Sequence, residues 1–163
     1  MNYEEVLDRA AKYLAYKPRT RRQLCDHLKS RGAGEEDIAR CVEMMESYHL
    51  LDDMEYTRMY IESRLSSGKG MNRIRQELRQ AGIENSMIED ALLLVEDLPD
   101  EYEMALNQAR AIMETENTAD MDYADRQKLM ARAARRLGSR GFSTDTVYRA
   151  VRAAMDERND HGI

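Results

Sequence analysis

Three glycines in the same register place the strongest constraint on how this 163-residue chain can fold. Gly32, Gly82 and Gly141 each follow a leucine by four residues and precede aliphatic residues by six and ten. Apolar residues four apart share one face of a helix, and glycine readily takes the left-handed backbone that ends a helix. The register therefore predicts three copies of a helical hairpin, each of which turns at its glycine.

A further amphipathic segment precedes each hairpin, and the first of these carries Val6 and Ala10 on one face. Strong helix formers dominate the composition, and only two prolines interrupt it. We therefore predict an all-α fold of three tandem three-helix repeats in an elongated, curved arrangement, with boundaries at 2–53, 54–99 and 100–158. The third repeat is longer because it contains "METENTADMDYADRQ", which we interpret as an acidic insert or a helix extension.

Helix start signals support these boundaries. Thr20 with Gln23 three residues later forms a capping-box pattern, in which each side chain bonds the other residue's backbone N–H. Ser143 follows the third glycine at an N-cap position, and Asp52 or Asp53 can cap the first helix of the second repeat.

The run Gly68-Lys69-Gly70 has some likeness to a phosphate-binding loop. Such a loop needs a glycine five residues before its Gly-Lys pair and a hydroxyl residue after it. Here those two positions hold Ser63 and Gly70, and the preceding segment reads as helix. We therefore interpret the two glycines as a bend between helices.

Acidic and basic residues are segregated along the chain, whose formal net charge is −6. Basic residues concentrate in the second helix of each predicted repeat, and acidic residues in the connecting segments. Three basic helices on one side would attract phosphates or an acidic partner. The sequence leaves open the alternative of solvated faces with intramolecular ion pairs. The candidate contact residues are Arg21, Arg22, Lys69, Arg73, Arg75, Arg135, Arg136 and Arg140.

Several functional classes find no support in the sequence. No nucleophile–base pattern of a known enzyme class is present, so we expect no catalytic activity. Cys25 and Cys41 with His27 and His49 match no zinc-site spacing, and we expect no metal and no cofactor. Because no stretch resembles a membrane span or a secretory signal, we expect a cytoplasmic protein. No coiled-coil seam is visible, so we expect a monomer.

The sequence resembles the RecX regulatory proteins of bacteria from about Val6 to Met155. The resemblance is carried by "LDRAAKYLAYKPRTRRQLCDHLKSRG", "LLDDMEYTRMYIESRLSSGKGMNRIRQELRQAGI" and "RRLGSRGFSTDTVYRAV". The second stretch has the family's arginines at Arg58 and Arg64, and the third has its Arg-Gly-Phe-Ser tetrapeptide. Thr57 departs from the pattern, because the family usually has alanine there.

The resemblance implies a non-enzymatic regulator that binds the RecA filament on single-stranded DNA and reduces its ATPase, strand-exchange and coprotease activities. It suggests a contact with single-stranded DNA as well. Arg58 and Arg64 either face the partner or brace Asp53 within the fold. Reversing the charges of Arg73 and Arg75 is predicted to weaken inhibition without unfolding the protein.

Two other functions remain open from the residues alone. A DNA-binding helical-repeat protein that acts without a recombinase would bind naked DNA with a steep salt dependence. A helical scaffold for peptides would show a concave apolar groove instead of basic helices. The segregated charge favours the first two hypotheses over the scaffold, and the net acidity favours the filament regulator over a plain DNA binder.

Overall fold

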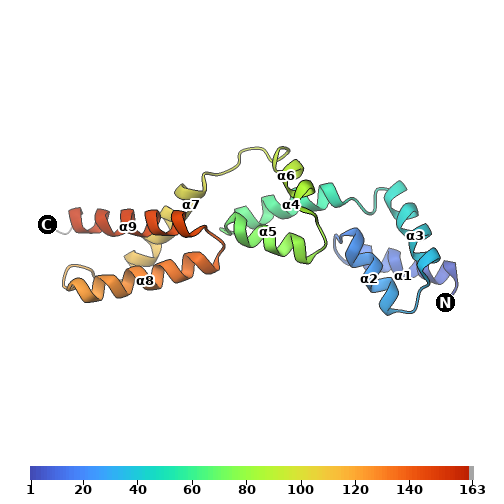
Figure 1. Cartoon of the computed structure of the whole chain (residues 1–163), viewed down its shortest axis with the longest axis horizontal. Coiled ribbons are helices and arrows are strands. Elements are labelled where there is room, and N and C mark those ends of the chain that lie inside the picture. Colours follow the sequence, from blue (N-terminus) through green and yellow to red (C-terminus); the bar gives the residue numbers. More distant parts are fainter. Residues whose placement is uncertain (162–163) are drawn as a thin grey trace. The chain divides into compact units, whose positions relative to one another are not determined.

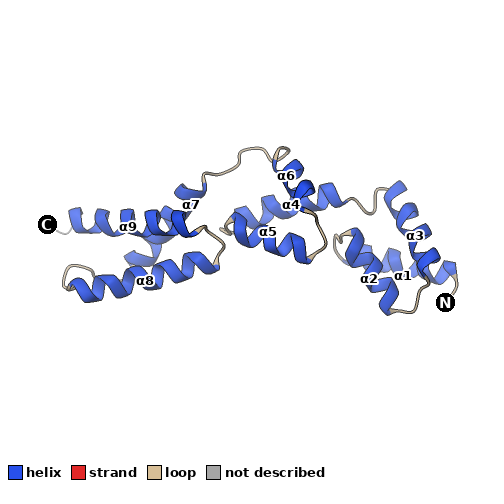
Figure 2. Ribbon diagram, viewed as in Figure 1, coloured by secondary structure: helices blue, strands red, loops and turns tan. Residues whose placement is uncertain are grey.

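The computed structural model describes residues 1–161, and within that range all regular structure is helical (Figures 1 and 2). This confirms the predicted all-α class. The nine helices of the described residues are α1 (Tyr3–Tyr16), α2 (Arg21–Ser30), α3 (Glu35–Ser47), α4 (Asp53–Ser66), α5 (Met71–Gln80), α6 (Asn85–Leu92), α7 (Glu101–Glu114), α8 (Tyr123–Ser139) and α9 (Thr144–His161). None of them is apolar over a length that would cross a membrane.

The chain divides into two compact units. The first comprises Met1–Glu62 and Arg75–Val95, and the second comprises Ser63–Ile74 and the chain from Glu96 onward. The division therefore passes through α4 and α5, so that the bend between these helices belongs to the second unit.

Each unit has its own apolar core. In the first unit, α1, α2 and α3 pack on one another around Leu24, Leu28 and Val42, which are almost completely buried. In the second unit, α7, α8 and α9 enclose Met113 and Leu137, which are fully buried. Leu28 and Leu137 are two of the leucines in the glycine register, so the repeat pattern identified core positions correctly.

The predicted helix ends are present. Gly32, Gly82 and Gly141 have φ values of +92°, +93° and +103°, the left-handed conformation expected after a helix. Gly68 also has a positive φ and lies between α4 and α5, so the glycine–lysine–glycine run is a bend, as predicted.

The predicted helix starts are present as well. Thr20 and Gln23 form the complete capping box of α2. The hydroxyl of Ser143 accepts from the N–H of Thr146 at the start of α9. Of the two candidate aspartates, Asp52 acts as the cap of α4, because its carboxylate accepts from the N–H of Glu55, whereas Asp53 is the first residue of the helix.

The acidic stretch in the third predicted repeat contains both an insert and a helix extension. Residues 115–122 connect α7 to α8, and α8 is 17 residues long whereas α2 and α5 have 10 each. Asp122 caps α8 by accepting from the N–H of Asp125 at 2.8 Å.

Candidate partner-binding surface

The eight predicted contact residues fall into two groups. Five of them make polar contacts inside the fold, whereas three have no ion pair or side-chain hydrogen bond among the described residues. The five engaged residues are Arg21, Arg22, Arg73, Arg75 and Arg140, and the remaining three are Lys69, Arg135 and Arg136.

In the first unit, Arg21 and Arg22 lie at the start of α2 beside acidic groups. The backbone N–H of Arg21 donates to Asp53 at 2.8 Å, and its guanidinium lies 3.4 Å from Glu46. Asp53 is therefore engaged by Arg21 and not by Arg58, which instead bonds Glu55 and Glu62 along α4. The idea that Arg58 braces Asp53 was wrong. The reason is that Glu55 and Glu62 lie one helical turn before and after Arg58, so their carboxylates are nearer to its guanidinium.

The aliphatic part of the Arg22 side chain packs against Gly82, which has no side chain to occupy that space. A Cβ atom placed on Gly82 would lie 2.5 Å from the Cβ of Arg22. The hydroxyl of Thr20, just before α2, donates to the carbonyl of Ala81 at 2.6 Å. We call this contact a turn-to-cap joint: the residue before the second helix of one predicted repeat bonds the carbonyl just before the turn glycine of the next.

The second unit contains the same kind of joint. The N–H of Gly70, just before α5, donates to the carbonyl of Arg140 at 2.8 Å, and Arg140 precedes the turn glycine Gly141. The guanidinium of Arg73 donates to the carbonyl of Ser139 at 3.2 Å, and that of Arg140 donates to Gln108 at 2.6 Å.

Five of the predicted contact residues therefore make polar contacts within the fold. Arg75 pairs with Glu89, and Arg73 lies in the joint of the second unit. Reversing both charges would set a carboxylate against Glu89 and another against the carbonyl of Ser139. Both arginines therefore have contacts inside the fold, and we expect the double reversal to lower the free energy of unfolding as well as to weaken inhibition.

Arg135 and Arg136 are the predicted contact residues most free to meet a partner. Both are exposed on α8, and the described residues supply neither with a carboxylate. Lys69 is half-buried in the bend between α4 and α5. These three side chains carry positive charge that the fold does not neutralise.

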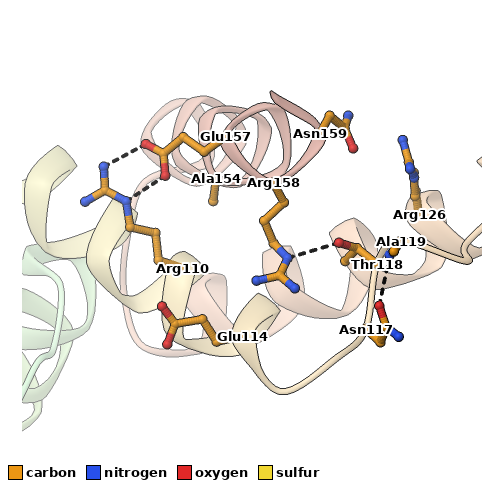
Figure 3. Close-up of a pocket in the computed structure, with 10 residues that line it drawn as sticks. All are labelled: Arg110, Glu114, Asn117, Thr118, Ala119, Arg126, Ala154, Glu157, Arg158 and Asn159. Atoms are coloured by element: carbon orange, nitrogen blue, oxygen red, sulfur yellow. Dashed lines mark hydrogen bonds and ion pairs between the residues drawn. The ribbon is translucent and has the colours of Figure 1, made fainter. Parts of the chain in front are cut away.

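A polar cavity of about 370 Å³ lies within the second unit, beside the 115–122 connection (Figure 3). Arg110 donates two hydrogen bonds to Glu157, at 2.8 and 2.7 Å, and the carboxylate raises the pKa of Arg110. Arg158 donates to the hydroxyl of Thr118 at 3.1 Å and to the carbonyl of Glu116 at 2.9 Å. These bonds tie α7 and the connection to α9, so we interpret this charged cavity as structural.

The prediction overlooked a group of basic residues in the first unit. Arg9, Arg19 and Arg31 are not among the predicted contact residues, although Arg19 and Arg31 flank or end the basic helix α2. Arg9 precedes Tyr13 by one helical turn, and Arg31 follows His27 by one turn. Such i, i+4 pairs on two consecutive helices are the signal that sequence reasoning could have used.

The structure thus defines a class: an all-α protein of three-helix groups that are connected by turn-to-cap joints and carry basic residues on the surface. Two protein-family models of this kind match the chain. The model described as "RecX, first three-helix domain" matches residues 7–44, and the model described as "RecX, second three-helix domain" matches residues 52–92. The chain belongs to the RecX family.

Individual relatives support this membership along the chain. A protein of Halorhodospira halophila named "Regulatory protein RecX" is 36% identical over 98% of this chain and 93% of its own length. A protein of the same name from Bacillus licheniformis is 30% identical over 94% of this chain, which spans only 56% of that relative.

Solved structures agree with the fold. The crystal structure of RecX from Lactobacillus salivarius has a TM-score of 0.75 and covers 93% of this chain and 96% of its own, at 24% identity. A second crystal structure, of a regulatory protein RecX, has a TM-score of 0.72 at 26% identity and matches 93% of this chain. The relatives are named regulatory proteins, which agrees with the regulatory class expected from the sequence.

Proposed function

We propose that this chain is a regulator of the RecA recombinase, which binds the RecA filament on single-stranded DNA in the cytoplasm and reduces its ATPase, strand-exchange and coprotease activities. The observation that carries the proposal is the family membership, which extends over 98% of the chain. RecX proteins are regulators by name, and RecA is the partner that the resemblance implies.

The surface supplies the second support. Arg135 and Arg136 are exposed and unneutralised on α8, so they can meet carboxylates of a protein filament or phosphates of its DNA. Charge complementarity of this kind accelerates association and fixes orientation more than it adds affinity. We therefore propose these two arginines, with Lys69, as the partner contacts.

The test is the single-stranded-DNA-dependent ATPase of a bacterial RecA while this protein is titrated in. Inhibition is expected at less than one copy per RecA protomer, because a regulator of a filament acts on many protomers at once. An unchanged ATPase rate at a large excess of the protein would contradict the proposal.

Two double variants separate the proposed contacts from general charge effects. R135E/R136E is expected to need about tenfold more protein for half-inhibition, since two charge-assisted contacts become repulsive. K128E/R152E makes the same change of net charge at two other exposed positions of α8 and α9. Equal weakening by both variants would refute the assignment to Arg135 and Arg136.

A further inference from the structure

The line of contact between α1 and α2 carries aromatic rings and arginines along one side of the first unit. The two helices pack on each other and are joined by only four residues, 17–20. We call this surface the α1–α2 seam, and its members are Arg9, Tyr13, Tyr16, Arg19, His27 and Arg31.

An aromatic stack forms the middle of the seam. The rings of Tyr13 and His27 lie 3.9 Å apart at an angle of 5°. The guanidinium carbon of Arg19 lies 4.2 Å from the centre of the Tyr13 ring and 5.9 Å from that of Tyr16. Tyr16 is 81% exposed, so one flat ring at this end of the seam is open to solvent.

The positive charges of the seam are not neutralised. Arg9 and Arg31 are exposed, and neither forms an ion pair within the described residues. Arg19 packs on aromatic rings, and its Nε is buried without a hydrogen-bond acceptor. The charges that act on His27 come from these three arginines and, with burial as the larger cause, lower the pKa of His27. An excess of positive charge therefore surrounds the stack.

We infer that the α1–α2 seam binds a single nucleic-acid strand, with its arginines on the phosphates and Tyr16 stacked on a base. Guanidinium groups interleaved with an exposed flat ring suit a ligand that alternates anionic phosphates with aromatic bases. An acidic protein segment would use the charges alone and would leave the open ring of Tyr16 without a function. The inference goes beyond the proposed function, because it predicts strand binding by this chain in the absence of any recombinase.

The spacing of the seam fits several successive contacts. Arg9 and Tyr16 are seven residues apart on α1, a distance of roughly 10 Å at 1.5 Å per helical residue. Arg31 lies one turn beyond His27 on α2, at the end of the seam where Arg9 lies one turn before Tyr13. Arg9 and Arg31 therefore provide charge at one end, and Arg19 with Tyr16 provides charge and stacking at the other.

The test is fluorescence anisotropy of a labelled 20-nucleotide oligo-dT with the full chain and without RecA, over a series of salt concentrations. R9Q/R31Q is expected to lose about tenfold or more in affinity. Its slope of log K against log salt should become shallower by about 1.4, because each phosphate contact with a single strand contributes about 0.7. Neither side chain has an ion-pair or hydrogen-bond partner among the described residues, so the variant should remain folded.

Matched variants decide between the possible outcomes. Y16A is expected to lose about tenfold while Y16F retains binding, since phenylalanine preserves the stacking surface. K128Q/R152Q, in the second unit, should bind as the unmodified chain does. No binding by the unmodified chain, or equal losses in K128Q/R152Q and R9Q/R31Q, would overturn the inference. A further pair of results would also overturn the inference: poly-glutamate competes with oligo-dT at the same concentration of charge, and Y16A binds as the unmodified chain does. Together these results would assign the seam to an acidic protein.

The outcome is independent of the proposed function. RecA is absent from the oligonucleotide assay, and inhibition of its ATPase is measured separately. Failure to bind oligo-dT together with normal ATPase inhibition would remove the seam inference and leave the filament regulator in place.

Discussion

At Gly141 two separate requirements for glycine coincide. The φ of +103° lies in the left-handed region, which costs other residues about 1–2 kcal/mol. A Cβ at this position would also lie 2.3 Å from the Cβ of Arg73 and 2.7 Å from its backbone nitrogen. Gly32 has a similar φ of +92°, but a Cβ there would have no atom beyond its chain neighbours within 4 Å among the described residues. The two glycines therefore separate the conformational requirement from the steric one.

Replacement of these glycines by alanine should show that difference. G32A is expected to lower the free energy of unfolding by about 1 kcal/mol, from backbone strain alone. G141A should lower it by about 3 kcal/mol or more, because the turn must also move away from α5 and lose the bond between Gly70 and Arg140. Urea unfolding followed by circular dichroism measures both, and equal losses would mean that the joint contributes nothing.

We expect His27 to make the stability of the first unit depend on pH. Burial and the charges of Arg31, Arg19 and Arg9 lower the pKa of His27 in the folded chain. The unfolded chain therefore takes up the proton at higher pH, near 6.5. The contribution of neutral His27 is present above that value and is lost as the pH falls through the lower folded pKa. We expect a smaller loss of stability between pH 7.5 and 5.5 in H27Q than in the unmodified chain.

An NMR titration provides the control for this prediction. In R31Q the pKa of His27 should rise toward its ordinary value, because one of the neighbouring positive charges is gone. The same pH dependence of stability in H27Q and in the unmodified chain would contradict the role given to His27.

The N-cap residue of helix α2, Thr20, forms hydrogen bonds with two helical hairpins. The hydroxyl of Thr20 accepts from the N–H of Gln23 at 3.2 Å within the capping box, and it donates to the carbonyl of Ala81 at 2.6 Å. Thr20 is fully buried, so neither bond can be replaced by water. The start of one element thereby fixes the end of another, 61 residues away.

Substitutions at this helix start should separate the cap from the joint. T20V retains the shape but loses both bonds, and we expect a loss of about 2–3 kcal/mol from the missing cap and the orphaned carbonyl of Ala81. T20S retains the hydroxyl and should lose about 1 kcal/mol, for one buried methyl group. Q23A removes the returning half of the capping box and the hydrogen bond between Gln23 and Tyr56, and should cost about 1 kcal/mol. Thermal unfolding compares the three, and a T20V protein as stable as T20S would disprove the joint.

Sequence reasoning at the scale of elements succeeded where the determinants are local. The capping box of Thr20 and the helix-ending glycines depend on residues within a few positions of one another, and all of them are present in the structure. The turn-to-cap joints and the stacking of Tyr13 on His27 could not be predicted, because they depend on which helices pack together. The engaged state of Arg73 and Arg75 has the same origin: Ser139 lies 66 positions from Arg73, and Glu89 lies on another helix from Arg75.

For the chain as a whole, the boundaries of the two compact units do not coincide with the boundaries of the three sequence repeats. Helices α4 and α5 each contribute to both compact units, whereas α1–α3 and α7–α9 each enclose a core cluster. The predicted second repeat, 54–99, is therefore divided between the two units: 54–62 and 75–95 belong to the first, and 63–74 and 96–99 belong to the second. Within the second unit the carbonyl of Gly68 accepts a hydrogen bond from the side chain of Gln108, and the N–H of Gly70 donates to the carbonyl of Arg140.

Fragments should reveal this difference between the repeats. Residues 2–53 contain the complete α1–α3 core cluster, and we expect them to be helical with a cooperative thermal transition. Residues 54–99 lack the partners of the bend, and we expect low helicity and no cooperative transition. Circular dichroism of the two fragments tests both expectations. A cooperative transition in 54–99 would show that this segment is an independent domain.

The turn-to-cap joint also limits how many three-helix groups such a chain can connect. Thr20 and Gly70 each stand 12 residues before a turn glycine, whereas Asp122, the cap of α8, stands 19 residues before Gly141. Position 129, where the equivalent cap would lie, is a buried leucine inside α8. The third group accepts a hydrogen bond from the helix start of the second group through the carbonyl of Arg140, but it has no helix start at position 129 to bond a following group. We expect duplication of the first or second group to lengthen the series, and a group appended after the third to lack a turn-to-cap joint with α8.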